Sequence, residues 1–235
     1  MTSCRVRGHL EESGATITSP ATARQQLIGG LAVTTDTYSE RVIHERLALL
    51  GRHAKAAVAA ATAERLFPLY LLYSRVSQEV SGPLVLRTAL DDVWGALMNR
   101  APKSSFHPYE AALSLVPDIE DPSWIPESAF AQNSAAAVAY AWKTWVADDP
   151  QQAVWALRQS VEAADFAAQS ETSAASLSRS SGSLVDAALN AIEYDLALAE
   201  TATDGFGALM DASTSHESWG WQLAHRWHRS NRAED

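Results

Sequence analysis

The chain has 235 residues, a formal net charge of −10 and a single cysteine, Cys4. With 47% hydrophobic and 20% charged residues, its composition is that of a globular protein and excludes a wholly disordered chain. A lone cysteine excludes an intramolecular disulfide and a cysteine-based zinc cage, which favours a reducing compartment. Since the sequence shows no secretory signal and no run of about 18 apolar residues, we expect a cytoplasmic protein without a membrane span.

The charge is unevenly spread along the chain. Residues 37–100 carry a net charge of +2, whereas residues 101–235 carry −12. An acidic surface repels nucleic-acid phosphates and attracts basic proteins, although acidity that merely keeps the protein in solution is the simpler explanation. Arg65, Arg75 and Arg87 form no sustained basic stripe, so we interpret them as charges on helix surfaces. We therefore expect no nucleic-acid partner.

Hydrophobic periodicity begins at Ser39. Residues 1–38 lack it, and we interpret them as a mobile or loosely docked leader. From Ser39 onward, apolar residues recur every three to four positions, as they do in amphipathic helices. The pattern predicts helices over residues 39–51, 53–80, 84–98, 107–116, 127–146, 150–171, 184–210 and 218–229. Pro68 predicts a kink or break in the helix over residues 53–80, and residues 181–183 are predicted to form a linker.

No segment alternates apolar and polar residues as strands do, and no repeat of about 34 residues occurs. We therefore predict an all-α fold, an irregular bundle of about seven to eight helices without a sheet. Residues 39–235 are expected to form a single helical domain.

The motifs of common catalytic and metal-binding sites are missing. The sequence contains no phosphate-cradling glycine loop, no Glu-x-x-His pair, no zinc-protease helix and no nucleophile elbow. His225 and His228 share a face of the last predicted helix with Trp221, but a metal would need a further acidic ligand. We therefore predict no metal site and no cofactor, while a catalytic triad assembled from distant residues stays open.

Two segments with a distinctive residue order carry a family resemblance. The segment AERLFPLYLLYSR and the segment LRTALDDVWGAL contain the residues Glu64, Arg65, Pro68, Tyr70, Leu90, Asp91 and Trp94. In this order they resemble the bacterial family named domain of unknown function 416, over about residues 45–205. The resemblance implies an all-helical fold, and it implies no catalytic residue because the family has no established activity.

Our leading hypothesis is a non-enzymatic protein that binds another, basic protein. Its most specific version is an immunity protein that neutralises a toxin, because a carboxylate-rich face can cover a basic substrate-binding surface. The candidate contact residues lie in an acidic connection between two predicted helices and are Asp118, Glu120, Asp121 and Trp124.

Two alternatives remain open. The first is a small-molecule-binding protein or enzyme whose inter-helix pocket is formed by Glu64, Arg65, Tyr70, Asp91 and Trp94. In the structural interpretation of the same motif, Glu64 and Arg65 tie adjacent helices, Pro68 sets a kink and Trp94 fills the core. The second alternative is a homodimer joined through the tryptophan-bearing helices.

Overall fold

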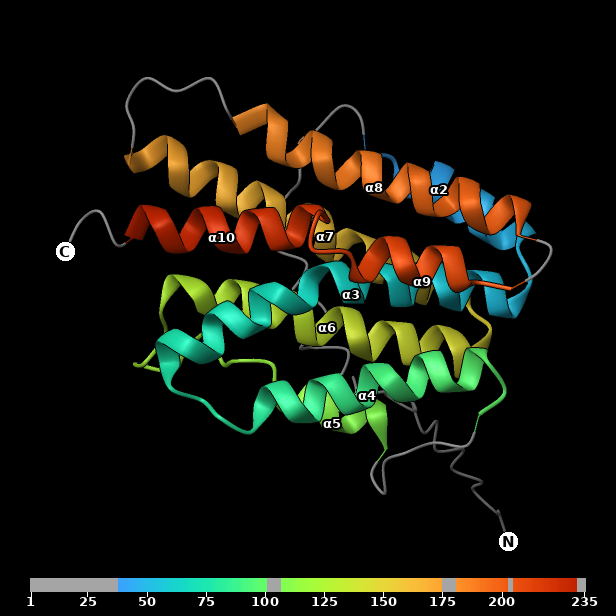
Figure 1. Cartoon of the computed structure of the whole chain (residues 1–235), viewed down its shortest axis with the longest axis horizontal. Helices are drawn as coiled ribbons and strands as arrows, with labels where there is room; N and C mark the ends of the chain where they lie inside the picture. Colours follow the sequence, from blue (N-terminus) through green and yellow to red (C-terminus); the bar gives the residue numbers. More distant parts are fainter. Residues whose placement is uncertain (1–37, 101–106, 175–180, 203–204, 232–235) are drawn as a thin grey trace, which may run out of the picture. The chain divides into compact units, whose positions relative to one another are not determined.

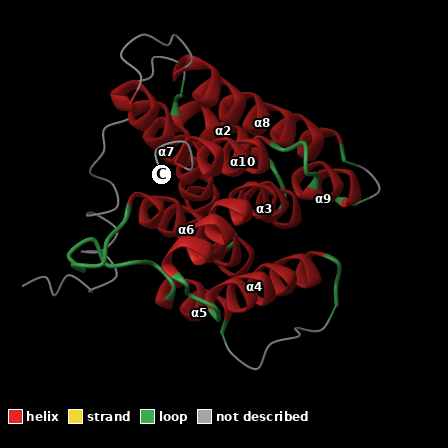
Figure 2. Cartoon of the chain, turned by 60° about the vertical axis from the view of Figure 1, so that its left-hand side comes forward, coloured by secondary structure: helices red, strands yellow, loops and turns green. Residues whose placement is uncertain are grey.

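The computed structural model describes residues 38–100, 107–174, 181–202 and 205–231, and the side chains among them except those of residues 171–183 and 230–231. Apart from Tyr38, the proposed leader lies outside the described residues. All of the described residues belong to one compact unit, residues 35–235. They form helices and loops without a strand (Figure 2), so the all-α prediction is confirmed.

The helices follow the chain order drawn in Figure 1. Their bounds are α2 (Glu40–Leu49), α3 (Arg52–Ser77), α4 (Gly82–Leu97), α5 (Pro108–Ser114), α6 (Pro126–Ala147), α7 (Pro150–Ala174), α8 (Ser181–Thr201), α9 (Gly207–Thr214) and α10 (Trp219–Asn231). Four of them carry a proline in the first turn, where its missing N–H leaves no hydrogen bond unmade and its fixed φ suits a helix. Each of these prolines therefore marks a helix start.

Helix α3 is the central element of the described helices. It packs against α4, α6, α7, α8, α9 and α10, and Figure 1 shows it running between them. Every side chain from Lys55 to Leu66 is buried, so this part of the helix is enclosed on all sides. Alanines make up much of that stretch and of α6, which lets the two helices approach closely. The Ser134 hydroxyl of α6 lies 2.8 Å from the Leu66 carbonyl oxygen of α3.

Helix α3 continues through Pro68 to Ser77, in agreement with the single helix predicted over residues 53–80, so of the two effects predicted for Pro68, a kink or a break, the break does not occur. Proline removes one backbone hydrogen bond, but it does not end a helix whose flanking turns are held by neighbours. Pro68 itself is buried, as are Leu66 and Leu69 on either side of it. Tertiary packing therefore overrides the local signal.

The predicted helix over residues 184–210 is two helices. Helix α8 ends at Thr201 and α9 begins at Gly207, with Gly205 between them at φ +103°, a left-handed conformation that favours glycine. The start of α8 also differs from the prediction, because residues 181–183 belong to the helix and are not a linker. Serine and glycine occur both in linkers and in the first turn of helices, so the local sequence does not distinguish the two.

Helix α10 crosses α3 at very short range. A Cβ added to Gly220 would lie 1.6 Å from the Arg65 carbonyl oxygen, so only glycine fits at this crossing. Further along α10, the Trp227 ring packs on Phe130 and Phe166, with ring centroids 4.8 and 5.9 Å away. The Trp227 indole also donates a 2.8 Å hydrogen bond to Glu127 at the start of α6. These contacts fix the C-terminal helix on the body.

None of the helices in the described ranges combines the length and apolarity needed to cross a bilayer.

Candidate functional site

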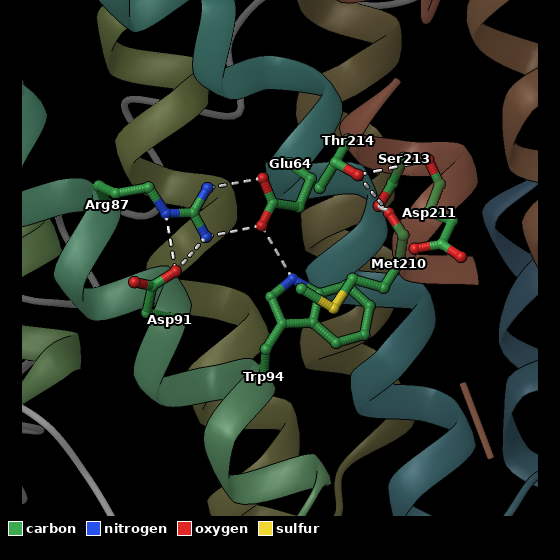
Figure 3. Close-up of polar contacts among 8 residues, drawn as sticks. All are labelled: Glu64, Arg87, Asp91, Trp94, Met210, Asp211, Ser213 and Thr214. Atoms are coloured by element: carbon green, nitrogen blue, oxygen red, sulfur yellow. Dashed lines mark hydrogen bonds and ion pairs between the residues drawn. The ribbon is translucent and has the colours of Figure 1, made fainter. Parts of the chain in front are cut away.

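Glu64 lies in the interior between α3 and α4, although it is a charged residue (Figure 3). It is only 5% exposed. Arg87 of α4 donates two parallel hydrogen bonds to it, from Nη1 to Oε2 at 2.8 Å and from Nη2 to Oε1 at 2.7 Å. The Trp94 indole Nε1 donates a third to Oε1 at 3.0 Å. The buried carboxylate thus receives the charged and polar donors that offset its desolvation.

Arg87 connects Glu64 to the second motif. Its Nε donates to Asp91 Oδ1 at 2.9 Å, and the guanidinium lies 5.3 Å from the centroid of the Phe67 ring. Burial alone would lower the pKa of Arg87, but the hydrogen bonds and charges of Glu64 and Asp91 raise it above the ordinary value. Arg87 is therefore a cation shared between two carboxylates, and the interpretation of it as a simple surface charge is wrong.

Arg65 points to a different side of α3. Its Nη2 and Nε donate to the two carboxylate oxygens of Asp195 on α8, at 2.6 and 3.2 Å. Its Nη1 donates to the Ala212 carbonyl oxygen of α9 at 3.0 Å. Both ionic side chains are buried. Consecutive residues of a helix project about 100° apart, which is why Glu64 and Arg65 reach different partners and not each other.

At the C-terminal end of α9, two side-chain hydroxyls form hydrogen bonds to the helix backbone (Figure 3). The hydroxyls of Ser213 and Thr214 each donate to the Met210 carbonyl oxygen at 2.9 Å. The Ala212 carbonyl instead accepts from Arg65, so the last turn of α9 is hydrogen-bonded directly to α3.

Tyr70 lies within α3, and its hydroxyl approaches Gly82 at the start of α4. A Cβ added to Gly82 would lie 2.2 Å from the Tyr70 hydroxyl oxygen, so a side chain at position 82 would displace the tyrosine. Burial, and then the nearby charge of Glu79, raise the pKa of Tyr70 above the ordinary range. The same Glu79 carboxylate accepts hydrogen bonds from the backbone N–H groups of Ser81 and Gly82 and so caps the start of α4.

The structure therefore brings together some of the predicted motif residues and separates others. Glu64, Asp91 and Trp94 meet around Arg87, whereas Arg65 and Tyr70 lie elsewhere along α3. The Glu64–Arg87 and Arg65–Asp195 pairs are mutually satisfied, which is the arrangement of a structural tie between helices and not of a catalytic carboxylate.

Sequence reasoning did not identify Arg87 as the partner of Glu64 or Asp195 as the partner of Arg65. Arg87, Asp91 and Trp94 are spaced four and three residues apart, so they share one face of a helix, and this spacing was a usable signal. Asp195 lies 130 residues from Arg65 along the chain, and no local pattern announces their pairing.

The predicted contact residues lie in the loop that joins α5 to α6, which we call the acidic loop, residues 118–124. Asp118, Glu120 and Asp121 are exposed, Trp124 is half-buried, and the apolar Ile119 between them is 61% exposed. No lysine or arginine occurs between Lys103 and Lys143, so the loop has no cationic neighbour in its own part of the sequence.

The acidic loop is ordered by its own turns. The Asp118 carboxylate accepts from the Glu120 backbone N–H at 3.1 Å, and the Asp121 carboxylate accepts from the Ser123 N–H at 2.8 Å and from its hydroxyl at 2.7 Å. These hydrogen bonds from Ser123 hold the pKa of Asp121 below its ordinary value. Both residues are exposed, so a donor from another molecule can reach their carboxylates.

The imidazoles near the C-terminus contact an indole ring. The Trp221 ring lies between His216 and His225, with ring centroids 4.6 and 5.8 Å away. Within the described ranges, no three His, Cys, Asp or Glu side chains are grouped as metal ligands would be. The proposed pair of His225 and His228 thus gains no third ligand there.

An all-α bundle held by buried Arg–carboxylate pairs is a structural class without a fixed activity. The chain belongs to the family described as "Protein of unknown function (DUF416)", whose model matches residues 42–200. This confirms the resemblance stated from the two motifs. A crystal structure of a DUF416 family protein from Shewanella baltica OS155 is similar, with 20% sequence identity, a TM-score of 0.48, and coverage of 80% of this chain and 93% of that one. No curated protein matches the chain.

Proposed function

We propose that the chain is a protein-binding domain and that its acidic loop contacts a basic partner protein. The observation that carries this proposal is the exposure of three carboxylates around an exposed Ile119 in a loop with defined turns. Charged groups steer a basic partner and fix its orientation, whereas a buried apolar contact supplies much of the affinity. The loop offers both kinds of contact in one place.

The hydrogen-bonded turns favour binding because they order the loop in advance. A loop that becomes ordered only on binding loses conformational freedom, and this loss reduces the affinity. Asp118 and Asp121 already hold the backbone of the loop through their carboxylates. The half-buried Trp124 follows them at the point where the chain enters α6, which links the loop to the helical body.

In the more specific version of this proposal, the chain is an immunity protein. Its partner would be a nucleic-acid-cutting toxin, whose substrate-binding face is basic because it must attract phosphates. The carboxylates of the acidic loop would then occupy the positions of those phosphates. This version predicts that the purified partner cuts nucleic acid and that an equimolar amount of the chain stops the cutting.

The experiment is an affinity capture from the native cell, followed by mass spectrometry and a binding titration with the purified partner. The loop variant combines Asp118→Asn, Glu120→Gln and Asp121→Asn, which remove charge but keep the oxygen atoms that accept the turn hydrogen bonds. We expect the loop variant to bind the partner at least about tenfold more weakly than the original chain, a loss of about 1.4 kcal/mol. Binding of the original chain should also weaken as salt is added.

The matched control removes the same number of charges from exposed carboxylates elsewhere, through Glu45→Gln, Asp211→Asn and Glu217→Gln. This control variant should bind as the original chain does. A partner that binds the loop variant and the original chain equally well would remove the acidic loop from the interface and contradict the proposal.

A further inference from the structure

A groove with a volume of about 510 Å³ lies between α2 and α8. This volume is within the range of small-molecule sites, roughly 300 to 1,000 Å³. The groove is lined by residues of these two helices and of the segment just before α2, whereas the acidic loop joins α5 and α6. An inference about the groove therefore goes beyond the proposed function and does not depend on it.

The floor of the groove is aliphatic. Ile43 of α2 and Ile192 of α8 are almost fully buried, and Val42 and Leu189 add further aliphatic groups to the lining. The Tyr38 ring forms part of the lining just before α2 begins. These groups favour a ligand with a hydrocarbon body, because burying apolar surface is the main source of affinity in such sites.

The charged groups that line the groove are all negative. They are Asp186 and Glu193 of α8, and the lining includes no lysine, arginine or histidine. Glu193 already forms an ion pair with Arg46 at 2.6 Å, whereas Asp186 has no ion pair with any other described side chain. Asp186 therefore leaves one carboxylate available to a cation in the groove.

Arg46 holds the two walls of the groove together. From α2 it contacts Glu193 at 2.6 Å and Glu200 at 2.9 Å, both on α8 and two turns apart. These two ion pairs connect α2 to α8, and both helices also pack against α7. The groove is thus preformed, which reduces the cost of binding a ligand.

We infer that the groove between α2 and α8 binds a small organic ammonium compound with an aliphatic body. The hydrocarbon part would contact Ile43, Leu189 and Ile192, and the ammonium group would pair with the Asp186 carboxylate. An anionic ligand of the same size would meet two carboxylates and no cation in the lining, so the groove should reject it.

The test is a titration of the full chain with three probes of equal chain length, followed by NMR of the isoleucine and leucine methyl groups. The probes are hexylammonium, hexanol and hexanoate. We expect hexylammonium to bind about threefold more tightly than hexanol, because an ion pair with an exposed carboxylate adds a small contribution to the apolar contacts. Hexanoate should not bind, and the shifted methyl signals should belong to Ile43, Leu189 and Ile192.

Two variants assign the binding to the groove. Asp186→Asn should weaken hexylammonium binding about threefold and leave hexanol binding unchanged, whereas Leu189→Trp should fill the groove and abolish both. Asp211→Asn, which removes an exposed carboxylate on α9, should change neither affinity. Because Asp186 is exposed, its variant is expected to fold even if Leu189→Trp does not.

Three results would overturn the inference. These are equal affinity for the three probes or binding of none of them, methyl shifts outside the groove, and unchanged hexylammonium binding in Asp186→Asn. If hexylammonium fails while a lysine-containing peptide shifts the same methyl groups, the groove takes a protein side chain instead, and the small-molecule inference is wrong.

Discussion

Glu64 shows how a buried charge is made tolerable by its partners. Taking a carboxylate out of water costs several kcal/mol, and that cost is offset only if nearly every acceptor position is used. Two hydrogen bonds from Arg87 and one from Trp94 meet this condition at Glu64. Removing Glu64 or Arg87 alone leaves the other charged group without its partner. The loss of stability is then larger than the stability that the intact pair adds to the fold.

We predict that Glu64→Gln lowers the free energy of unfolding by about 2 to 4 kcal/mol, because Arg87 loses its buried counter-charge. The matched control is Glu45→Gln, which breaks the pair with Arg41 at the surface, where both side chains are more than half exposed. That change should cost less than about 0.5 kcal/mol. Urea denaturation of the two variants measures the difference. Equal and small effects would show that Glu64 is not a structural tie.

Lys55 and Asp148 give a prediction that depends on pH. The buried Lys55 ammonium lies 2.8 Å from an Asp148 carboxylate oxygen, and this interaction lowers the pKa of Asp148. A carboxylate with a lowered pKa stabilises the fold above the pKa of the unfolded chain, about 3.9, and loses this contribution as the pH falls through the folded pKa.

We therefore predict that Asp148→Asn is less stable than the original chain at pH 7 and that the difference shrinks below about pH 4. Asparagine suits this position because residue 148 has φ +56°, and asparagine tolerates the left-handed region well. Thermal melting between pH 2.5 and pH 7 measures the gap. If the difference in melting temperature stays constant over this range, the negative charge of Asp148 does not contribute to stability through Lys55.

Helix α3 is the central helix, and specific contacts connect it to α4, α8, α9 and α10. Glu64 connects it to α4, and Arg65 connects it to α8 and α9. Helix α10 is held differently, because it contacts the α3 backbone directly at Gly220. Two adjacent charged residues and one distant glycine thus account for how four helices are positioned on a single central one.

We predict that Gly220→Ala destabilises the chain by about 3 kcal/mol or more, because the new Cβ would overlap a backbone oxygen that cannot move aside easily. Gly207→Ala is the matched control, since a Cβ there meets no atom within 4 Å. That change should be neutral or slightly stabilising, as alanine favours helix. The measurement is the urea midpoint of both variants. A tolerated Gly220→Ala would mean that α10 does not cross α3 at this distance.

For the whole molecule, the fold class followed from hydrophobic spacing, while the details depended on contacts between distant segments. The helix periodicity of residues 39 to 229 identified most of the helices. It missed the interruption near Gly205, because the apolar spacing continues on both sides of it. It predicted helix on both sides of Pro68 but left open whether the proline breaks that helix, because the packing that holds those turns comes from other helices.

The candidate sites differ in the same way. The acidic loop was visible from the sequence, since prolines and carboxylates cluster there without a lysine or arginine. The groove between α2 and α8 was not, because its two walls are more than 140 residues apart along the chain. Nor did the sequence distinguish a pocket from a structural tie at Glu64, since the two have the same residue types and differ only in whether the charges are paired.

We expect the family motif to hold the helices together and the acidic loop to bind the proposed partner, so that each role can be lost without the other. The most direct test is a calorimetric titration of the purified partner into the original chain, the loop variant and Glu64→Gln, with a melting curve of each. We predict that the loop variant melts at the original temperature but binds at least about tenfold more weakly, and that Glu64→Gln melts lower while its folded form binds with the original affinity. Full affinity in the loop variant, together with lost affinity in a folded Glu64→Gln, would mean that the partner binds at the family motif and not at the acidic loop.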